Sequence, residues 1–107
     1  MKQKAEIIKQ TEKNNDSSLR AFHIFAKGKV QGVGFRYWTR SLAKSLNING
    51  WVRNRADYSV EIFAEGNTEN LEEFIYALKN EHPYARVENL TVEKVGLKGF
   101  KNFNIEI

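Results

Sequence analysis

The stretch GKVQGVGFRYW, residues 28–38, joins two segments with different hydrophobic patterns. Before it, residues 20–28 alternate apolar and polar positions, which predicts a β-strand. After it, apolar residues from Phe35 to Leu46 recur at helical spacing, which predicts an α-helix. Three of the seven glycines of the chain fall in the first seven residues of this stretch, and Arg36 follows in the first turn of the predicted helix.

The rest of the chain continues the alternation of strand and helix patterns. The patterns predict strands at 50–54 and 58–66, a helix at 67–80 that Asn67 or Thr68 can cap, and strands at 85–95 and 100–107. With right-handed crossovers, the order βαββαβ predicts a ferredoxin-like α+β sandwich. We expect an antiparallel sheet of four to five strands, two helices packed on one face, and the other face open to solvent.

Composition limits the classes of protein that the chain can be. The 107 residues suit one compact domain, and 41% of them are hydrophobic. The absence of cysteine excludes disulfides, zinc–thiolate sites and cysteine nucleophiles. No apolar run has the length of a membrane span, and we expect a cytoplasmic protein. Residues 1–19 are polar and are predicted to form a flexible tail before a domain at 20–107.

The glycine-rich loop and the predicted helix after it favour an anion site. Glycine adopts positive φ without strain, so successive backbone N–H groups can turn toward one point. The start of the helix directs unpaired N–H groups and its positive dipole end to the same place. Arg36 adds a guanidinium that can bind two oxygens at once. A tight strand-to-helix connection with an incidental arginine is the alternative, since short glycine motifs are weakly specific.

Two motifs in order resemble the signatures of the acylphosphatase family. GKVQGVGFR matches the family signature Gly-x-Val-Gln-Gly-Val-x-Phe-Arg at every defined position. GWVRN followed by SVEIFAEG is similar to the second signature, and LEEF, PYARVE and a closing FNI follow in family order. The resemblance covers residues 20–107 and leaves only the tail outside it.

The resemblance implies an enzyme that hydrolyses the carboxyl-phosphate bond of small acyl phosphates to a carboxylate and inorganic phosphate. By motif position, Arg36 would bind phosphate and Asn54 would position the attacking water. The implied phosphate cradle consists of Gln31, Gly32, Val33, Gly34, Phe35 and Arg36. Carboxylates do not cluster near either motif, so no metal or other cofactor is implied. We expect a monomer with no nucleic-acid or membrane partner, and inorganic phosphate as product or inhibitor.

One position departs from the family pattern. Tyr58 stands in the turn after Asn54, where the family has glycine. If this position needs positive φ, tyrosine loses about 1 kcal/mol or more by adopting it. Alternatively the turn shifts, and Asp57 or Asn54 takes the left-handed conformation. The sequence leaves both possibilities open, and it does not show whether Asn54 lies beside the glycine loop.

Other readings assign different roles to the sheet. Phe25 and Phe63 fall on the expected open face, where a phosphate- or RNA-binding module with weakened catalysis would use them. The third strand carries acids and lacks the expected RNA-binding pattern. A domain of the hydrogenase-maturation type is a further rival, but such domains belong to much larger chains. We expect the remaining titratable residues to be structural: Asp57, Glu61 and Glu65 on a solvated strand face and hairpin, His23 on the surface, and His82 in a turn.

Overall fold

The computed structural model describes residues 18–107, so all but two residues of the predicted tail lie outside the described residues. Leu19, assigned to the tail above, is the first residue of the first strand. The elements are β1 (Leu19–Lys29), α1 (Phe35–Ser45), β2 (Asn49–Asn54), β3 (Val60–Asn67), α2 (Thr68–Asn80), β4 (Arg86–Val95) and β5 (Phe103–Ile105). Neither described helix is long and apolar enough to cross a membrane.

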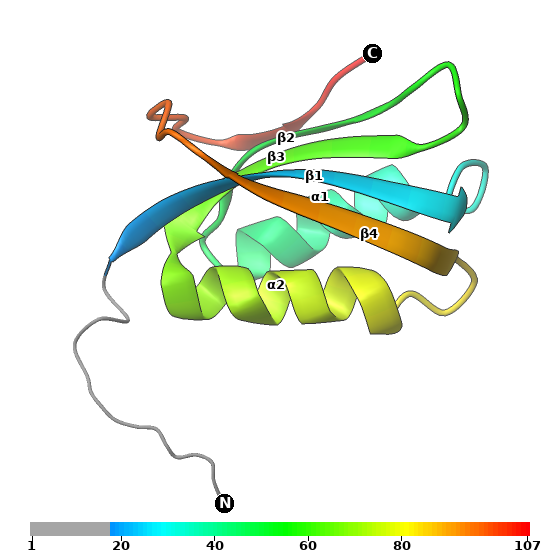
Figure 1. Ribbon diagram of the computed structural model, residues 1–107, viewed down its shortest axis with the longest axis horizontal. Coiled ribbons are helices and arrows are strands. Elements are labelled where there is room, and N and C mark those ends of the chain that lie inside the picture. The colour runs from blue at the N-terminus through cyan, green and yellow to red at the C-terminus, as the bar shows by residue number, and fades with distance from the viewer. Residues whose placement is uncertain (1–17) are drawn as a thin grey trace, which may run out of the picture.

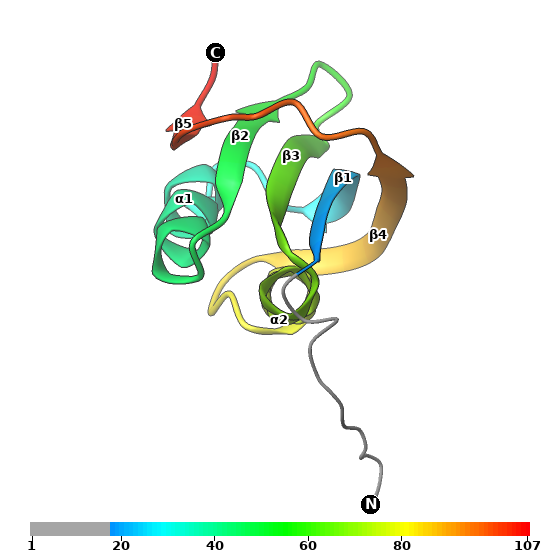
Figure 2. The same cartoon turned by 90° about the vertical axis from the view of Figure 1, so that its left-hand side faces the viewer.

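The predicted ferredoxin-like α+β sandwich is confirmed. Five strands form one sheet in the order β4-β1-β3-β2-β5. The four strands of the βαββαβ core pair antiparallel, and both helices lie on one face of the sheet (Figures 1 and 2). The core fills the space between them with fully buried side chains. These include Ile24, Val52 and Ile62 from the sheet, Phe35 and Phe74 from the helices, and Phe103 from β5.

The fifth strand corrects the expectation of a wholly antiparallel sheet. β5 pairs parallel with β2, so the sheet is mixed. The reason is the route of the chain after β4. Residues 96–102 reverse direction and cross from one edge of the sheet to the other, where β5 then runs along β2 (Figure 2).

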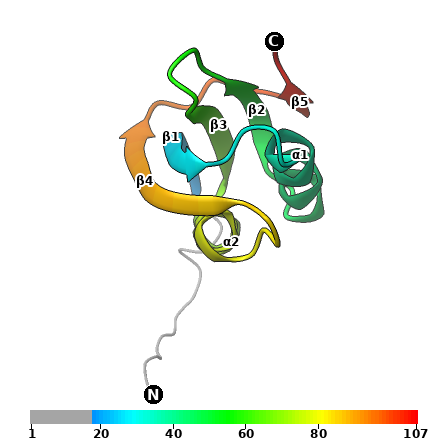
Figure 3. The same ribbon diagram turned by 90° about the vertical axis from the view of Figure 1, so that its right-hand side faces the viewer.

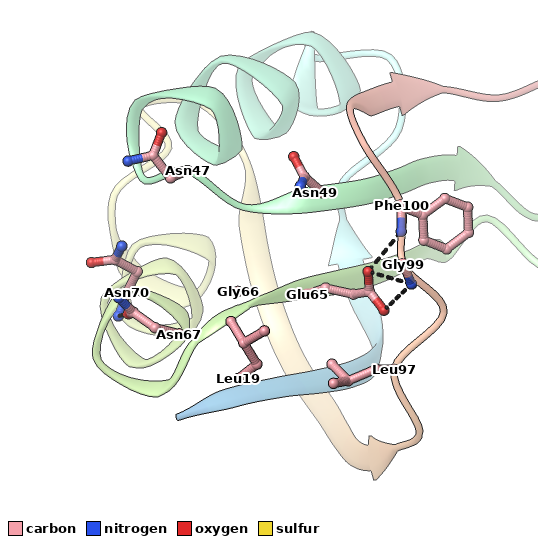
Figure 4. Close-up of a pocket in the computed structure, with 10 residues that line it drawn as sticks. All are labelled: Leu19, Asn47, Asn49, Glu65, Gly66, Asn67, Asn70, Leu97, Gly99 and Phe100. Carbon is pink, nitrogen blue, oxygen red and sulfur yellow. Dashed lines mark hydrogen bonds between the residues drawn. The ribbon is translucent and has the colours of Figure 1, made fainter. Parts of the chain in front are cut away.

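This crossing segment also corrects the prediction that the second sheet face is open. Phe63 is only 6% exposed, because Phe100 packs on it with ring centroids 5.3 Å apart. Glu65 is buried as well. Its carboxylate accepts a hydrogen bond from the backbone N–H of Lys98. It also accepts from the backbone N–H groups of Gly99 (3.0 Å) and Phe100 (2.9 Å) (Figure 4). The carboxylate is thus a structural acceptor that holds the crossing segment on the sheet.

Glu61 was also predicted to lie on a solvated face. This prediction is wrong, because Glu61 is only 4% exposed. Its carboxylate accepts from Arg53 Nε at 2.8 Å and lies 2.6 Å from His23 Nε2. A second arginine, Arg55, places its guanidinium 3.5 Å from the same carboxylate. Burial alone would raise the pKa of Glu61, but the hydrogen bonds from Arg53 and His23 lower it overall. His23, expected to be a surface residue, is a half-buried partner in this cluster.

The hairpin between β2 and β3 keeps its turn at Tyr58. Tyr58 has φ 71°, while neither Asp57 nor Asn54 is left-handed, so the turn has not shifted. Arg55 N donates to Ser59 O at 2.9 Å and Tyr58 N to Arg55 O at 3.1 Å, which closes the turn. With the turn closed in this way, the β2–β3 ladder extends to its last pair, in which Asn54 lies opposite Val60.

Replacing Tyr58 with glycine is expected to stabilise the protein. The tyrosine side chain is 76% exposed, so few contacts are lost. The left-handed conformation costs a non-glycine residue about 1–2 kcal/mol, and glycine removes this cost. The larger conformational entropy of glycine in the unfolded chain opposes this gain by about 0.5–1 kcal/mol. We expect the unfolding free energy to rise by about 0.5–1 kcal/mol in urea denaturation. An unchanged or lower stability would show that the turn holds no strain.

Candidate active site

The sheet topology places the two sequence motifs at one end of the molecule. β1 and β2 both run antiparallel to β3, which lies between them, so the carboxyl ends of β1 and β2 lie at the same end of the sheet. The loop at 30–34 follows β1 and leads into α1 at this end (Figure 3). Asn54 is the last residue of β2 and lies at the same end. The position of Asn54, which the sequence left open, is therefore beside the loop.

The loop and Asn54 line one pocket of about 190 Å³. Its lining residues are Val30, Gln31, Gly32, Gly34, Phe35, Arg36, Tyr37 and Asn54. Among the residues predicted for the cradle, only Val33 is not a lining residue; its side chain packs against the core instead. The structure thus brings Arg36 and Asn54 together, although 18 positions separate them in the chain (54 − 36).

The backbone of the loop requires glycine at two positions. Gly32 and Gly34 both have φ 77°, and a Cβ atom at either position would meet nothing within 4 Å. Conformation rather than space therefore selects glycine here. Gly34 is the N-cap of α1 and provides no side-chain cap, and no acidic residue lies in the first turn. Within the helix, the first N–H groups of α1 therefore have neither a side-chain cap nor an acidic neighbour, which is the usual condition of an anion site.

Arg36 and Asn54 both have unused hydrogen-bonding capacity. Within residues 18–107, no carboxylate lies within 4.0 Å of the Arg36 guanidinium. The side-chain oxygen of Asn54 is buried and accepts no hydrogen bond from the described residues. Buried polar atoms in proteins are nearly always paired, so this oxygen is open to a partner such as a water molecule or a ligand.

Gln31 has a side-chain contact that sequence reasoning missed. Its Nε2 donates to the backbone carbonyls of Arg55 (3.0 Å) and Ser59 (2.9 Å), tying the loop to the β2–β3 hairpin. The hairpin is further ordered by Asp57, whose carboxylate accepts from Ser59 Oγ and Ser59 N; these hydrogen bonds lower the pKa of Asp57. No local signal reveals the Gln31 contact, because its partners lie 24 and 28 residues away.

His82 packs against the start of α1 and contacts the loop that precedes this helix. Its Nδ1 accepts from Tyr84 N (3.0 Å) and Ala85 N (2.8 Å), the turn role that the sequence predicts. Its ring also lies 5.7 Å from Phe35 and 5.1 Å from Trp38. Burial lowers the pKa of His82, and a hydrogen bond with the Val33 backbone only partly offsets that shift.

Acid is expected to weaken the fold through His82. The folded pKa lies below the unfolded value of about 6.5, so the unfolded state binds more protons below neutral pH. The stabilisation by neutral His82 is therefore complete above about pH 6.5 and is lost as pH falls through the folded pKa. His82→Asn keeps an acceptor for the turn without titrating. Urea denaturation between pH 8 and pH 5.5 should show a smaller loss in this variant than in the wild type; equal losses would contradict the role.

A larger pocket of about 420 Å³ lies at the other end of the sheet (Figure 4). It is lined mainly by asparagines, glycines and leucines around Glu65, including Asn47 and Asn49 at the start of β2. None of the predicted site residues lies there. Its single acid already accepts three backbone N–H groups, and the pocket adjoins the end of β2 opposite to Asn54.

The fold and the pocket define a class: ferredoxin-like α+β proteins in which a glycine loop between a strand and a helix shares a pocket with an arginine and an asparagine. The family model described as acylphosphatase matches residues 22–105. The chain belongs to the acylphosphatase family, and the protein is an acylphosphatase.

Relatives and solved structures agree with this assignment. An acylphosphatase from Treponema denticola is 67% identical over 90 residues, which span 84% of this chain and 96% of the relative. The crystal structure of acylphosphatase from Bacillus subtilis matches with a TM-score of 0.80 and 40% identity, covering 84% of this chain and all of that one. The structure of an acylphosphatase from Coxiella burnetii matches with a TM-score of 0.79 and 31% identity over 82% and 93% of the two chains. These matches favour an enzyme over the alternative of a phosphate- or RNA-binding module.

Proposed function

We propose that the pocket at Asn54 hydrolyses the carboxyl-phosphate bond of small acyl phosphates, with Arg36 and the loop as the phosphate site. One observation carries this proposal. Arg36, Asn54 and the glycine loop, which come from two separate motifs, line the same pocket of about 190 Å³. A volume of this size suits a phosphoryl group and the atoms around the scissile bond.

The phosphoryl group is bound by a backbone cradle and one cation. Backbone N–H groups from Gln31 to Arg36 donate to the phosphoryl oxygens, supported by the positive end of the α1 dipole. The Arg36 guanidinium donates to two oxygens as a fork. Because the cradle is already formed, it stabilises the charge of the transition state without having to reorganise.

Asn54 positions the water that attacks phosphorus. Its buried side-chain oxygen accepts from a water O–H, and its amide N–H₂ holds the phosphoryl group in line. The water oxygen forms a bond to phosphorus while the bond from phosphorus to the acyl oxygen breaks. The carboxylate leaves with the electron pair, and the water proton ends on the phosphate, giving RCOO⁻ and H₂PO₄⁻ from RCO–OPO₃²⁻. A carboxylate with a conjugate-acid pKa of about 4 needs no general acid to leave.

The proposal extends to the setting of the enzyme. We propose a monomer in the cytoplasm that takes small acyl phosphates, releases or is inhibited by inorganic phosphate, and needs neither a metal nor a nucleic-acid partner. The sheet face opposite the helices supports the proposal that no nucleic-acid partner is needed. An RNA platform presents exposed aromatics, whereas Phe63 is buried here and Glu61 and Glu65 lie on the same face.

Hydrolysis of benzoyl phosphate, followed by ultraviolet absorbance with EDTA present, tests the proposal. We expect rapid turnover that EDTA does not reduce, with competitive inhibition by inorganic phosphate. If the protein binds inorganic phosphate but does not hydrolyse benzoyl phosphate, the phosphate cradle stands and the proposed hydrolysis is wrong. Turnover that EDTA abolishes would overturn the metal-free mechanism.

A further inference from the structure

We infer that the enzyme prefers acyl phosphates whose acyl part carries a second anionic group, and that Arg40 binds this group. The inference rests on the proposed function, because it takes the phosphoryl group to lie at Arg36. It assigns a role to a side chain that neither motif includes. Arg40 lies four residues after Arg36 on α1, so the two side chains emerge from the same side of the helix about one turn apart.

The first observation is a second cavity that adjoins the phosphate site. It has a volume of about 680 Å³ and lies between α1 and β5, which run side by side (Figure 3). Its lining residues are Arg36, Tyr37, Arg40, Asn104, Ile105 and Ile107. Arg36 and Tyr37 also line the phosphate pocket, so the two spaces meet at these side chains. The acyl part of a substrate bound at Arg36 can extend directly into this cavity.

The second observation concerns the hydrogen bonds and ion pairs of the Arg40 side chain. Its Nε–H is buried and has no hydrogen-bond partner in the part of the chain that the structure describes. No carboxylate among residues 18–107, including the terminal one of Ile107, lies within 4.0 Å of its guanidinium, and no Asp or Glu side chain lines the cavity. The two terminal guanidinium nitrogens of Arg40 are not among the buried atoms and make no hydrogen bond within residues 18–107, so they can donate to an anion in the cavity as a fork.

The hairpin side of the site does not offer the same environment. A cavity of about 380 Å³ adjoins Asn54 there, and it is lined by Arg53 and Arg55. Both of these arginines lie within ion-pair distance of Glu61, and Asp57 adds a further negative charge. Of these two cavities among the described residues, the one beside Arg40 therefore matches a second anion on the substrate better.

The residues between the two arginines fit an acyl chain. Tyr37 and Ile105 provide aromatic and apolar surface, and the Asn104 amide can donate to an anion alongside Arg40. A carboxylate matches the planar guanidinium fork better than a single point charge would. The expected substrate is thus a small acyl phosphate with a carboxylate at its far end.

The test compares isosteric substrates with and without the second charge. The probes are 3- and 4-carboxybenzoyl phosphate, each against its carbamoylbenzoyl counterpart, which is neutral at the same position. These rigid rings place the second group at two distances and cannot cyclise onto the acyl phosphate. For the wild type we expect KM about tenfold lower for at least one carboxylate substrate than for its neutral partner, with similar kcat.

Arg40→Gln should abolish this preference while leaving the neutral substrates unchanged, which also shows that the variant is folded. The control is Lys44→Gln, which removes an exposed charge one turn further along α1 and should keep the preference. Hydrolysis of all four substrates without a preference, or a preference that survives in Arg40→Gln, would overturn the inference alone. If the wild type hydrolyses neither the neutral nor the charged substrates, the proposed function fails, and this inference fails with it.

Discussion

Replacing Arg36 with alanine is expected to lower kcat/KM for benzoyl phosphate by at least about 1000-fold. Loss of one preorganised donor to a developing charge typically costs about 100- to 1000-fold in rate. The Arg36 fork supplies two donors and a full charge, and no other described arginine lines the 190 Å³ pocket. Competitive inhibition by inorganic phosphate should disappear in the same variant, because binding and chemistry use the same guanidinium.

Two further variants make the Arg36 result specific. Arg36→Lys keeps the charge but not the fork, so it should recover part of the phosphate affinity and little of the rate. Lys44→Ala removes an exposed cation from the same helix and should leave activity within about twofold, since the site does not include it. Turnover of folded Arg36→Ala within about tenfold of the wild type would contradict the phosphate role.

Replacing Asn54 with alanine is expected to reduce kcat by at least about 100-fold while KM and inhibition by phosphate change little. Within residues 18–107, the buried side-chain oxygen of Asn54 accepts no hydrogen bond, so its removal breaks no contact that holds the cradle. Asn54→Asp should do more harm, since a carboxylate facing the phosphoryl group repels it and should raise KM as well.

Asn49→Ala provides the matched control for Asn54. Asn49 lies at the other end of β2, where it lines the 420 Å³ pocket, and its replacement should leave kcat unchanged. A variant Asn54→Ala that loses phosphate affinity but retains kcat would show that Asn54 binds substrate and does not position water. Far-ultraviolet circular dichroism of each variant separates these outcomes from loss of the fold.

Local features of the structure follow from the sequence because their causes are local. The sequence predicts that Asn67 or Thr68 caps α2, and Asn67 is the residue that does so: its side chain accepts from Asn70 N at 2.9 Å, three residues away. The glycines at Gly32 and Gly34 were expected to take positive φ, and both do so at 77°. Such features depend on the conformational range of one residue and on neighbours within one turn, both of which can be read from a few letters.

Other features depend on contacts between distant parts of the chain. The sequence predicts that the sheet face opposite the helices is solvated, because both helices pack on the other face. The burial of Glu61 and Glu65 results from partners 8 to 38 residues away, including the segment that crosses the sheet before β5. A pattern of polarity cannot distinguish an acid that faces water from one that is paired, since both favour the same side chain.

Two questions left open by the sequence were decided by the tertiary structure. Tyr58 keeps the left-handed position in the turn, because the hairpin hydrogen bonds of Arg55 and Ser59 hold it there. Asn54 lies beside the loop, because β3 runs antiparallel between β1 and β2.

The sequence by itself determined the ferredoxin-like sandwich and the glycine loop with Arg36 at the start of α1, since these rest on periodicity, order and backbone preference. It also determined the family, through two motifs that resemble the family signatures. Only the tertiary structure decided which side chains meet: Asn54 with the loop, Gln31 with the hairpin, and Arg40 with the cavity beside Arg36. The physical reason is that pairing of strands and crossing of segments set distances between residues remote in the chain, and no local preference encodes those distances.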